Sequence, residues 1–174
     1  LAYDPATLAQ TFAFNNTPFG VVGMSAKTSA RQRTASLAVD NRKTTVGAAD
    51  RRHDLAQHPG AVLGDEPQDL AYRGVPTGLR IGDRNVFREH AVIQRATQAG
   101  TSTEIGDDNY VMSNAHIAHN AHVGRRVIVC SGALVAGHVV LGDQAFISGN
   151  CVLHQHIRVG ELAIMRGLSR ASRD

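Results

Sequence analysis

The chain has 174 residues, a formal net charge of +3 and an aromatic content of 5% without tryptophan. No apolar run approaches the roughly 18 residues that a transmembrane helix needs, and the first residues do not resemble a secretory signal peptide, so we expect no membrane span and a cytoplasmic location. The two cysteines, Cys130 and Cys151, are too few for a disulfide framework or a metal site, so both are expected to be reduced.

The first third of the chain differs from the rest in charge and in pattern. Residues 1–60 carry a surplus of three positive charges, whereas residues 61–174 are balanced. Because no sustained period of two, 3.6 or six runs through it, we assign residues 1–58 to a separate basic segment, disordered or poorly defined, and residues 59–174 to one domain. The basic residues are neither clustered nor interleaved with aromatics, so nucleic-acid binding is not expected. A start at Leu1 rather than Met indicates a fragment.

Two polar stretches interrupt the start of the second domain. Val62–Asp65 has the form of the end of a structural repeat, and the following residues 66–80 contain two prolines and cannot form a strand throughout. Residues 96–103 have the glycine and threonine content of another loop. We expect both stretches to project from a rigid scaffold, where binding residues often lie.

A repeat of six residues dominates the rest of the chain. Apolar residues recur at every sixth position, in phase with Ile81, Phe87 and Ile93 upstream, at Ile105, Val111, Ile117, Val123, Val129, Val135, Leu141, Ile147, Leu153, Val159 and Met165. Each hexad supplies one short strand, one inward aliphatic side chain and one turn. The repeat predicts an all-β fold, a left-handed parallel β-helix.

Three hexads make one triangular coil of about 18 residues, so residues 18 apart should stack at about 4.8 Å. This spacing predicts two columns along one edge, namely His119, Gly137 and Gln155 in the first and Asn120, His138 and His156 in the second. His116 and His154 lie next to the same edge. Histidines at turns are often only solvated, but here they stack in a column beside a glycine whose bare backbone can approach a ligand.

A histidine beside an exposed backbone N–H is the minimum apparatus for acyl transfer. The imidazole can take the proton from a hydroxyl nucleophile, while the N–H stabilises the tetrahedral oxyanion. The first column, in which His119 stacks on Gly137, therefore makes acyl transfer the leading hypothesis for this edge.

The same residues carry a family resemblance. Over residues 61–174 the chain resembles the UDP-N-acetylglucosamine O-acyltransferases, which catalyse the first step of lipid A synthesis, in the order and spacing of the segments 66–70, 81–85, 88–89, 114–119, 136–138 and 152–155. A hexapeptide repeat alone is shared by many acyltransferases. The combination of these segments is specific to the family.

The resemblance implies a role for each matching position. His119 matches the general base that deprotonates the sugar 3-hydroxyl for attack on the thioester of a hydroxyacyl carrier protein, and Gly137 matches the oxyanion-hole residue. Other matching positions imply substrate contacts at His116, Asn120, His138, His154 and Gln155. Gly167 matches the site of the acyl-length ruler.

The resemblance also implies partners and an assembly. The substrates are UDP-N-acetylglucosamine and an acyl carrier protein, which is acidic and could dock on Arg125, Arg126, Arg158 or Arg166. No cofactor and no metal ion are implied. The family forms homotrimers with active sites between neighbouring subunits. The helical C-terminal region of the family and its first coils are not recognisable in this sequence.

Three positions depart from the family pattern. Asn120 stands where some members have Asp; its side chain can accept a hydrogen bond from imidazole but cannot stabilise imidazolium by charge. Gln94 stands where the family often has His, and His156 where it often has Phe.

Other functions stay open at this point. Some trimeric β-helices of the carbonic-anhydrase type hold zinc across the subunit interface, and His116, His119, His122 and His138 invite that comparison. An inactive solenoid remnant with an intact histidine edge is a further alternative. An N-acyltransferase acting on the corresponding amino sugar is a near neighbour of the leading hypothesis, and segment 66–70 together with the His116 and His119 pair disfavours it.

Overall fold

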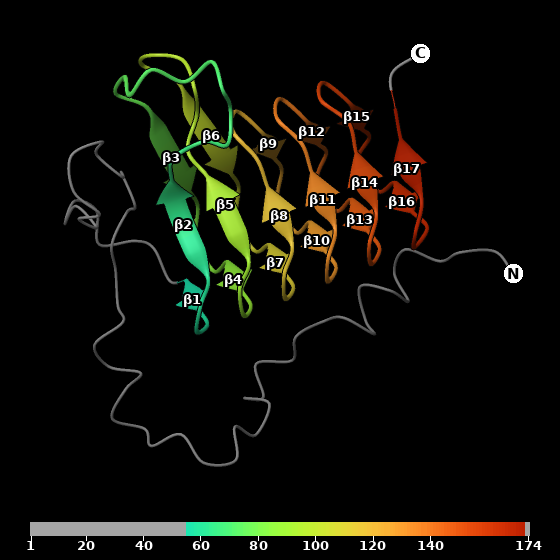
Figure 1. Cartoon of the computed structure of the whole chain (residues 1–174). Helices are drawn as coiled ribbons and strands as arrows, with labels where there is room; N and C mark the ends of the chain where they lie inside the picture. The colour runs from blue at the N-terminus through green and yellow to red at the C-terminus, as the bar shows by residue number, and fades with distance from the viewer. Residues whose placement is uncertain (1–54, 173–174) are drawn as a thin grey trace, which may run out of the picture. The chain divides into compact units, whose positions relative to one another are not determined.

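The computed structural model describes residues 55–172, which form a β-helix of short strands (Figure 1). The described range contains no helix, and so no helix that is long and apolar enough to cross a membrane. The expectation for residues 1–58 concerns a segment that lies almost entirely outside this range. We therefore describe only the β-helix.

The strands form three parallel sheets, one for each face of the helix. Face 1 consists of β1 (Ala56–Gln57), β4 (Val86–Phe87), β7 (Tyr110–Val111), β10 (Ile128–Val129), β13 (Phe146–Ile147) and β16 (Ile164–Met165). Face 2 consists of β2 (Val62–Asp65), β5 (Val92–Gln94), β8 (His116–Ile117), β11 (Leu134–Val135), β14 (Val152–Leu153) and β17 (Arg170–Ala171). Face 3 consists of β3 (Gly78–Ile81), β6 (Ser102–Ile105), β9 (His122–Val123), β12 (Val140–Leu141) and β15 (Arg158–Val159).

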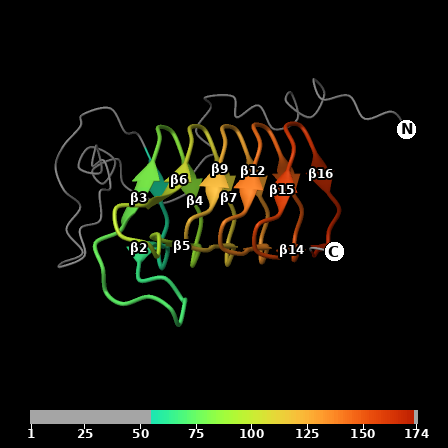
Figure 2. The same ribbon diagram turned by 90° about the horizontal axis from the view of Figure 1, so that it is seen from above.

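The pairing register confirms the 18-residue coil from β7 onwards. Leu134 pairs with His116 on one side and with Val152 on the other. Each chain turn therefore lies directly beside the next, as Figure 2 shows from above. Between the earlier strands the step is larger, because Val86 pairs with Ala56 and with Tyr110. The two expected loops account for the extra residues.

The repeated aliphatics form the core, as the sequence predicts. From Val111 to Leu153 their side chains are at most 1% exposed. Burying each Val, Leu or Ile contributes about 1.5–3 kcal/mol to stability. Val159 and Met165 are only partly buried at the last coil. Both cysteines are free thiols, as expected.

The coils turn at residues that adopt positive φ. At the corners, positions such as Asn114 (60°), Asn150 (54°) and His138 (61°) are left-handed. Asn and His tolerate this region better than most side chains. Part of the histidine column therefore serves the backbone turn.

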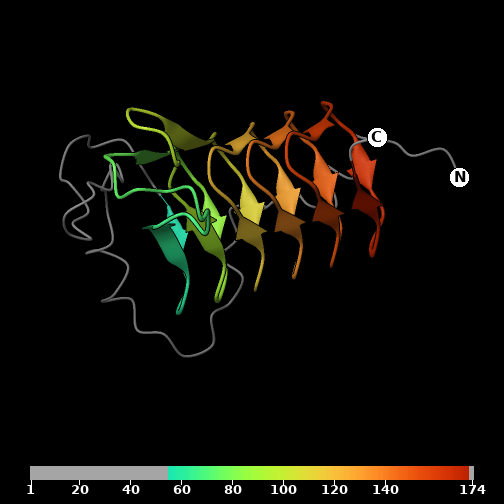
Figure 3. The ribbon, with the colours of Figure 1, turned by 45° about the horizontal axis from the view of Figure 1, so that its top comes forward.

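The two excursions are shorter than the sequence predicts, because β3 begins at Gly78 and β6 begins at Ser102. Their last residues already pair as strands, Gly78 with Ser102. The loops therefore comprise residues 66–77 and 96–101. Figure 3 shows the longer one beside the first coils.

A buried arginine fastens the longer loop to the coils. The side chain of Arg95 is 6% exposed, and its guanidinium donates to Glu66 Oε1 at 3.1 Å and to Tyr72 Oη at 3.2 Å. It also donates to the carbonyl oxygen of Gly64 at 3.2 Å. One guanidinium thus holds the start of the loop at Glu66 and its middle at Tyr72. These contacts position the loop over face 2.

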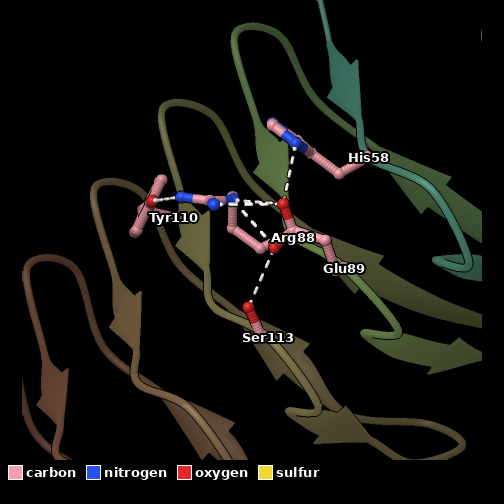
Figure 4. Close-up of polar contacts among 5 residues, drawn as sticks. All are labelled: His58, Arg88, Glu89, Tyr110 and Ser113. Atoms are coloured by element: carbon pink, nitrogen blue, oxygen red, sulfur yellow. Dashed lines mark hydrogen bonds and ion pairs between the residues drawn. The ribbon is translucent and has the colours of Figure 1, made fainter. Parts of the chain in front are cut away.

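A polar network joins the first three coils at the corner between faces 1 and 2 (Figure 4). Glu89 accepts hydrogen bonds from Arg88 at 3.0 Å and from Ser113 Oγ at 2.9 Å, and it pairs with His58 Nδ1 at 3.2 Å. Arg88 also donates to Tyr110 Oη at 2.7 Å. The hydrogen bonds from Arg88, from the backbone and from Ser113 lower the pKa of Glu89 to about 2.

Glu89→Gln is expected to make stability less dependent on pH in the acid range. A carboxyl whose pKa is depressed on folding contributes stability above its unfolded value, and this contribution is lost as pH falls through its folded value, here from about 4.5 to about 2. Thermal midpoints of wild type and variant should therefore differ near neutrality and converge across that window. Glu161→Gln, at an exposed glutamate outside this network, serves as the control. A gap between wild type and Glu89→Gln that stays constant with pH would contradict this account.

Candidate active site

The candidate site lies at the corner between faces 2 and 3. The turns 118–121, 136–139 and 154–157 stack there in successive coils, and we call them the His119 corner. The backbone N–H of His138 donates to the carbonyl of His119 at 3.1 Å, and that of His156 donates to the carbonyl of Gly137 at 3.2 Å. These bonds confirm the stacking of both predicted columns at the level of the backbone.

His119 lies directly against Gly137. The histidine is 6% exposed, and a Cβ atom placed on Gly137 would lie 2.6 Å from its Nε2. No side chain fits between the imidazole and this backbone, so the position requires glycine for close approach rather than for an unusual φ. Among the hydrogen bonds of residues 55–172, the N–H of Gly137 has no acceptor.

The second column differs from the expectation in its side chains. Asn120 turns toward the 96–101 loop, where its Oδ1 accepts hydrogen bonds from the N–H of Thr97 at 3.0 Å and from its Oγ1 at 2.9 Å. The ring of His138 instead forms a T-shaped pair with His119 at a centroid distance of 5.3 Å and stacks on His156 at 4.7 Å. The expected contact between Asn120 and imidazole is present, because Oδ1 lies 3.2 Å from Nδ1 of His119.

A pocket of about 460 Å³ opens beside this corner. Its lining includes four of the predicted site residues, namely His116, His119, Gly137 and Gln155. Asn120, His138 and His154 do not line it. Leu134 and Val152, which are 45% and 44% exposed, give the pocket an apolar floor on face 2. The pocket thus combines a reactive polar edge with an apolar surface.

Two further polar residues of the pocket were not selected from the sequence as site residues. Gln68 reaches the pocket from the 66–77 loop, and Gln94 from the end of β5. Gln94 is 2% exposed, and its Oε1 has no hydrogen-bond partner among the described residues. A buried acceptor of this kind can be satisfied by an ordered water molecule or by a donor on a bound molecule. The departure of Gln94 from the family pattern was the available signal.

Two histidines of the site, His116 and His138, have pKa values below the usual one for histidine. Burial lowers the pKa of His116, and the nearby His119 lowers it further. Burial also lowers the pKa of His138, as do His119 and His156, while Asp69 in the 66–77 loop opposes that shift. A lower pKa favours the neutral imidazole at these two positions, which leaves the substrate pocket beside His116 less positively charged.

The zinc alternative finds no support within one chain. Residues 55–172 contain no group of three or more His, Cys, Asp or Glu side chains placed to hold a metal ion. His122 Nδ1 instead pairs with Glu104 on face 3 at 3.1 Å. A site shared between subunits stays a hypothesis.

Known proteins match the same region. Residues 102–137 match the family model described as bacterial transferase hexapeptide (six repeats). An acyl-[acyl-carrier-protein]–UDP-N-acetylglucosamine O-acyltransferase from Synechocystis sp. is 46% identical over 116 residues, which are 67% of this chain and 42% of that protein. A protein of the same name from Agrobacterium fabrum is 38% identical over 118 residues, 67% of this chain and 44% of that protein.

Solved structures agree with these matches. A UDP-N-acetylglucosamine acyltransferase from Bacteroides fragilis 9343 superposes with a TM-score of 0.67 and 39% identity, covering 69% of this chain and 47% of that one. The corresponding enzyme from Arabidopsis superposes with a TM-score of 0.68 and 38% identity, covering 70% and 42%. The chain belongs to the hexapeptide-repeat transferase family. The expected left-handed parallel β-helix is confirmed by this fold likeness.

This chain spans less than half the length of the relatives named above. Two of its predicted site residues lie toward the last coils. His154 is exposed, and a Cβ atom on Gly167 would lie 3.5 Å from the carbonyl oxygen of Gly149, an ordinary contact. Packing therefore does not demand glycine at position 167.

Proposed function

We propose that the protein transfers a 3-hydroxyacyl group from acyl carrier protein to the 3-hydroxyl of UDP-N-acetylglucosamine, the first step of lipid A synthesis. The observation that carries this proposal is the close approach of the buried His119 imidazole to Gly137, whose backbone N–H has no acceptor among residues 55–172. Support also comes from the relatives, whose names specify an acyl carrier protein and this nucleotide sugar.

The geometry supports a two-part role in this reaction. His119 Nε2 takes the proton as the sugar oxygen attacks the thioester carbonyl carbon, and the Gly137 N–H holds the resulting oxyanion. When the intermediate collapses, the C–S bond breaks and His119 returns the proton to the carrier's sulfur. The sugar ester and the free thiol are the products, so atoms and charge balance.

The remaining predicted residues take binding roles in this proposal. His116 and Gln155 contact substrate within the pocket, and Gln94 accepts a hydrogen bond there. Asn120, His138 and His154 act from the surrounding surface. Gly167 is the acyl-length ruler in this proposal. Packing does not require glycine there, so the absence of a side chain leaves room for the acyl chain.

The proposal includes a homotrimer. The outward positions of face 2 include Leu134 and Val152, and those of face 1 include Ile164, all more than 40% exposed. Apolar strand faces of this kind favour burial against another subunit. For the acidic carrier protein, the docking candidates Arg126, Arg158 and Arg166 are all exposed. Arg125 already pairs with Asp143 at 2.9 Å, so it contributes less.

We expect the full chain to form the 3-O-acylated nucleotide sugar when it is incubated with UDP-N-acetylglucosamine and 3-hydroxyacyl carrier protein. The measurement is mass-spectrometric detection of the ester, with sedimentation to determine the oligomeric state. A control replaces the sugar by its 3-amino analogue, which an N-acyltransferase would prefer. A trimer that forms no ester would refute the proposed activity, and a monomer without activity would favour the solenoid remnant.

A further inference from the structure

The 96–101 loop reaches the candidate base through a single amide. Thr97 is 8% exposed, and its N–H and Oγ1 both lie within 3.0 Å of Asn120 Oδ1. At the other end of the same amide, Nδ2 donates to Thr101 Oγ1 at 3.1 Å. The loop therefore holds both ends of the Asn120 side chain.

These contacts decide which way the amide points. The backbone N–H of Thr97 can only donate, so the Asn120 atom that faces it must be the oxygen. Thr101 Oγ1 donates to the carbonyl of Gln98 at 2.7 Å, which leaves its lone pairs to accept from Nδ2. A flipped amide would set two donors against each other beside Thr97. The oxygen therefore also faces His119.

The amide orientation in turn decides the tautomer of His119. Asn120 Oδ1 lies 3.2 Å from Nδ1 and can only accept, so Nδ1 carries the hydrogen. The lone pair then lies on Nε2, which is the ring nitrogen nearer to the Cβ position of Gly137, at 2.6 Å against 3.0 Å for Nδ1. A free histidine side chain favours the opposite tautomer, with the hydrogen on Nε2. In that tautomer Nε2 cannot accept a proton from the substrate.

We propose that Thr97 and Thr101 are positioning residues that hold His119 in its proton-accepting tautomer through Asn120. This proposal deepens the acyl-transfer function and rests on it for its catalytic consequence. The tautomer itself follows from the contacts alone.

The stacked turns of the later coils lack this device. Across the 96–101 loop, paired residues in adjacent strands are more than the regular 18 residues apart, whereas in the later coils they are 18 apart. Among the three stacked turns, therefore, only that of His119 lies beside this insertion. In the next two coils the equivalent residues of Asn120 are His138 and His156, whose rings stack on each other. The backbone of Asn120 also contacts β6, the strand that follows the loop, because its N–H donates to the Oγ1 of the buried Thr103 at 2.8 Å. The 96–101 loop thus contacts the turn of His119 and not the similar turns of the next two coils.

The test compares Thr97→Val/Thr101→Val with Thr97→Ser/Thr101→Ser in the full chain labelled with ¹⁵N-histidine. The Val pair removes both hydroxyls at nearly constant volume, whereas the Ser pair retains them. Nitrogen chemical shifts distinguish a bare from a protonated ring nitrogen, and His119→Gln identifies the His119 signals. We expect a protonated Nδ1 and a bare Nε2 in wild type and in the Ser pair.

In the Val pair we expect a several-fold larger share of the Nε2–H tautomer. Because the N–H of Thr97 still donates to Asn120, the loss is partial, and kcat should fall about three- to tenfold with KM unchanged. The Ser pair should restore kcat. A merely structural role for the threonines would lower the thermal midpoint without moving the tautomer signals.

The inference is overturned if wild type carries the hydrogen on Nε2, or if the folded Val pair keeps the wild-type tautomer. Should the Val pair fail to fold, Asn120→Asp provides the second probe. Its carboxylate accepts at both oxygens, so Nδ1 should stay protonated. The negative charge beside the imidazole should also move the acid limb of the kcat/KM profile to higher pH. An unchanged acid limb counts against the inference. If the chain shows the expected tautomer but transfers no acyl group, the proposed function is refuted and the inference about the tautomer stands.

Discussion

His119→Ala is expected to reduce acyl transfer by about 10²- to 10⁴-fold, the usual contribution of a general base. The reason is that no other described side chain lies against the Gly137 backbone as this imidazole does. The measurement is kcat for ester formation under saturating substrates, with circular dichroism and sedimentation to show that the coil and its assembly survive.

His122→Ala is the matched control for this change. His122 lies on the outward side of face 3, is 58% exposed and pairs with Glu104, so its loss should leave transfer unchanged. A zinc site built from His119 and His122 would require both residues. Equal loss of activity in the two variants, restored by added zinc, would therefore favour the metal enzyme, and retained activity in His119→Ala would refute its assignment as the base.

Gly137→Ala is expected to lower kcat by about 10²-fold, because displacement of a catalytic group by about 1 Å has an effect of this size. The added methyl group would lie 2.6 Å from His119 Nε2, so the imidazole has to move. Glycine is not required here by backbone conformation, so any fall in the thermal midpoint reports only the displaced imidazole. Kinetics and thermal unfolding of the same preparation measure the two effects separately.

Gly160→Ala serves as the control for a glycine replacement in a neighbouring coil. A Cβ atom at this position meets nothing within 4 Å, so both kcat and the thermal midpoint should match those of wild type. If Gly137→Ala kept full activity, the close approach of His119 to this backbone would have no catalytic role.

The excursions show where sequence reasoning becomes less accurate. The polar and proline-rich residues 66–80 and the Gly- and Thr-containing residues 96–103 correctly predict two loops. Their last residues nevertheless pair as β3 and β6, because each strand gains backbone hydrogen bonds from the coil beside it. Local composition does not report this gain. The strand boundaries therefore depended on the tertiary partner.

The candidate site divides in the same way. The fixed spacing of His119 and Gly137 was sufficient to predict their contact, since both lie in regular coils. Gln94 and Thr97 precede or belong to an insertion, where counting by 18 fails. Neither the burial of Gln94 in the pocket nor the contact of Thr97 with Asn120 could be obtained from spacing.

By itself, the sequence determined the β-helix, its inward aliphatic residues and the stacking of His119 on Gly137. A strict period of six repeats one local geometry, so each residue's neighbour in the next coil follows from its number. Only the tertiary structure decided where the two loops pack and which way the Asn120 amide points. Those features depend on contacts between segments whose separation in the chain obeys no period, such as Thr97 with Asn120.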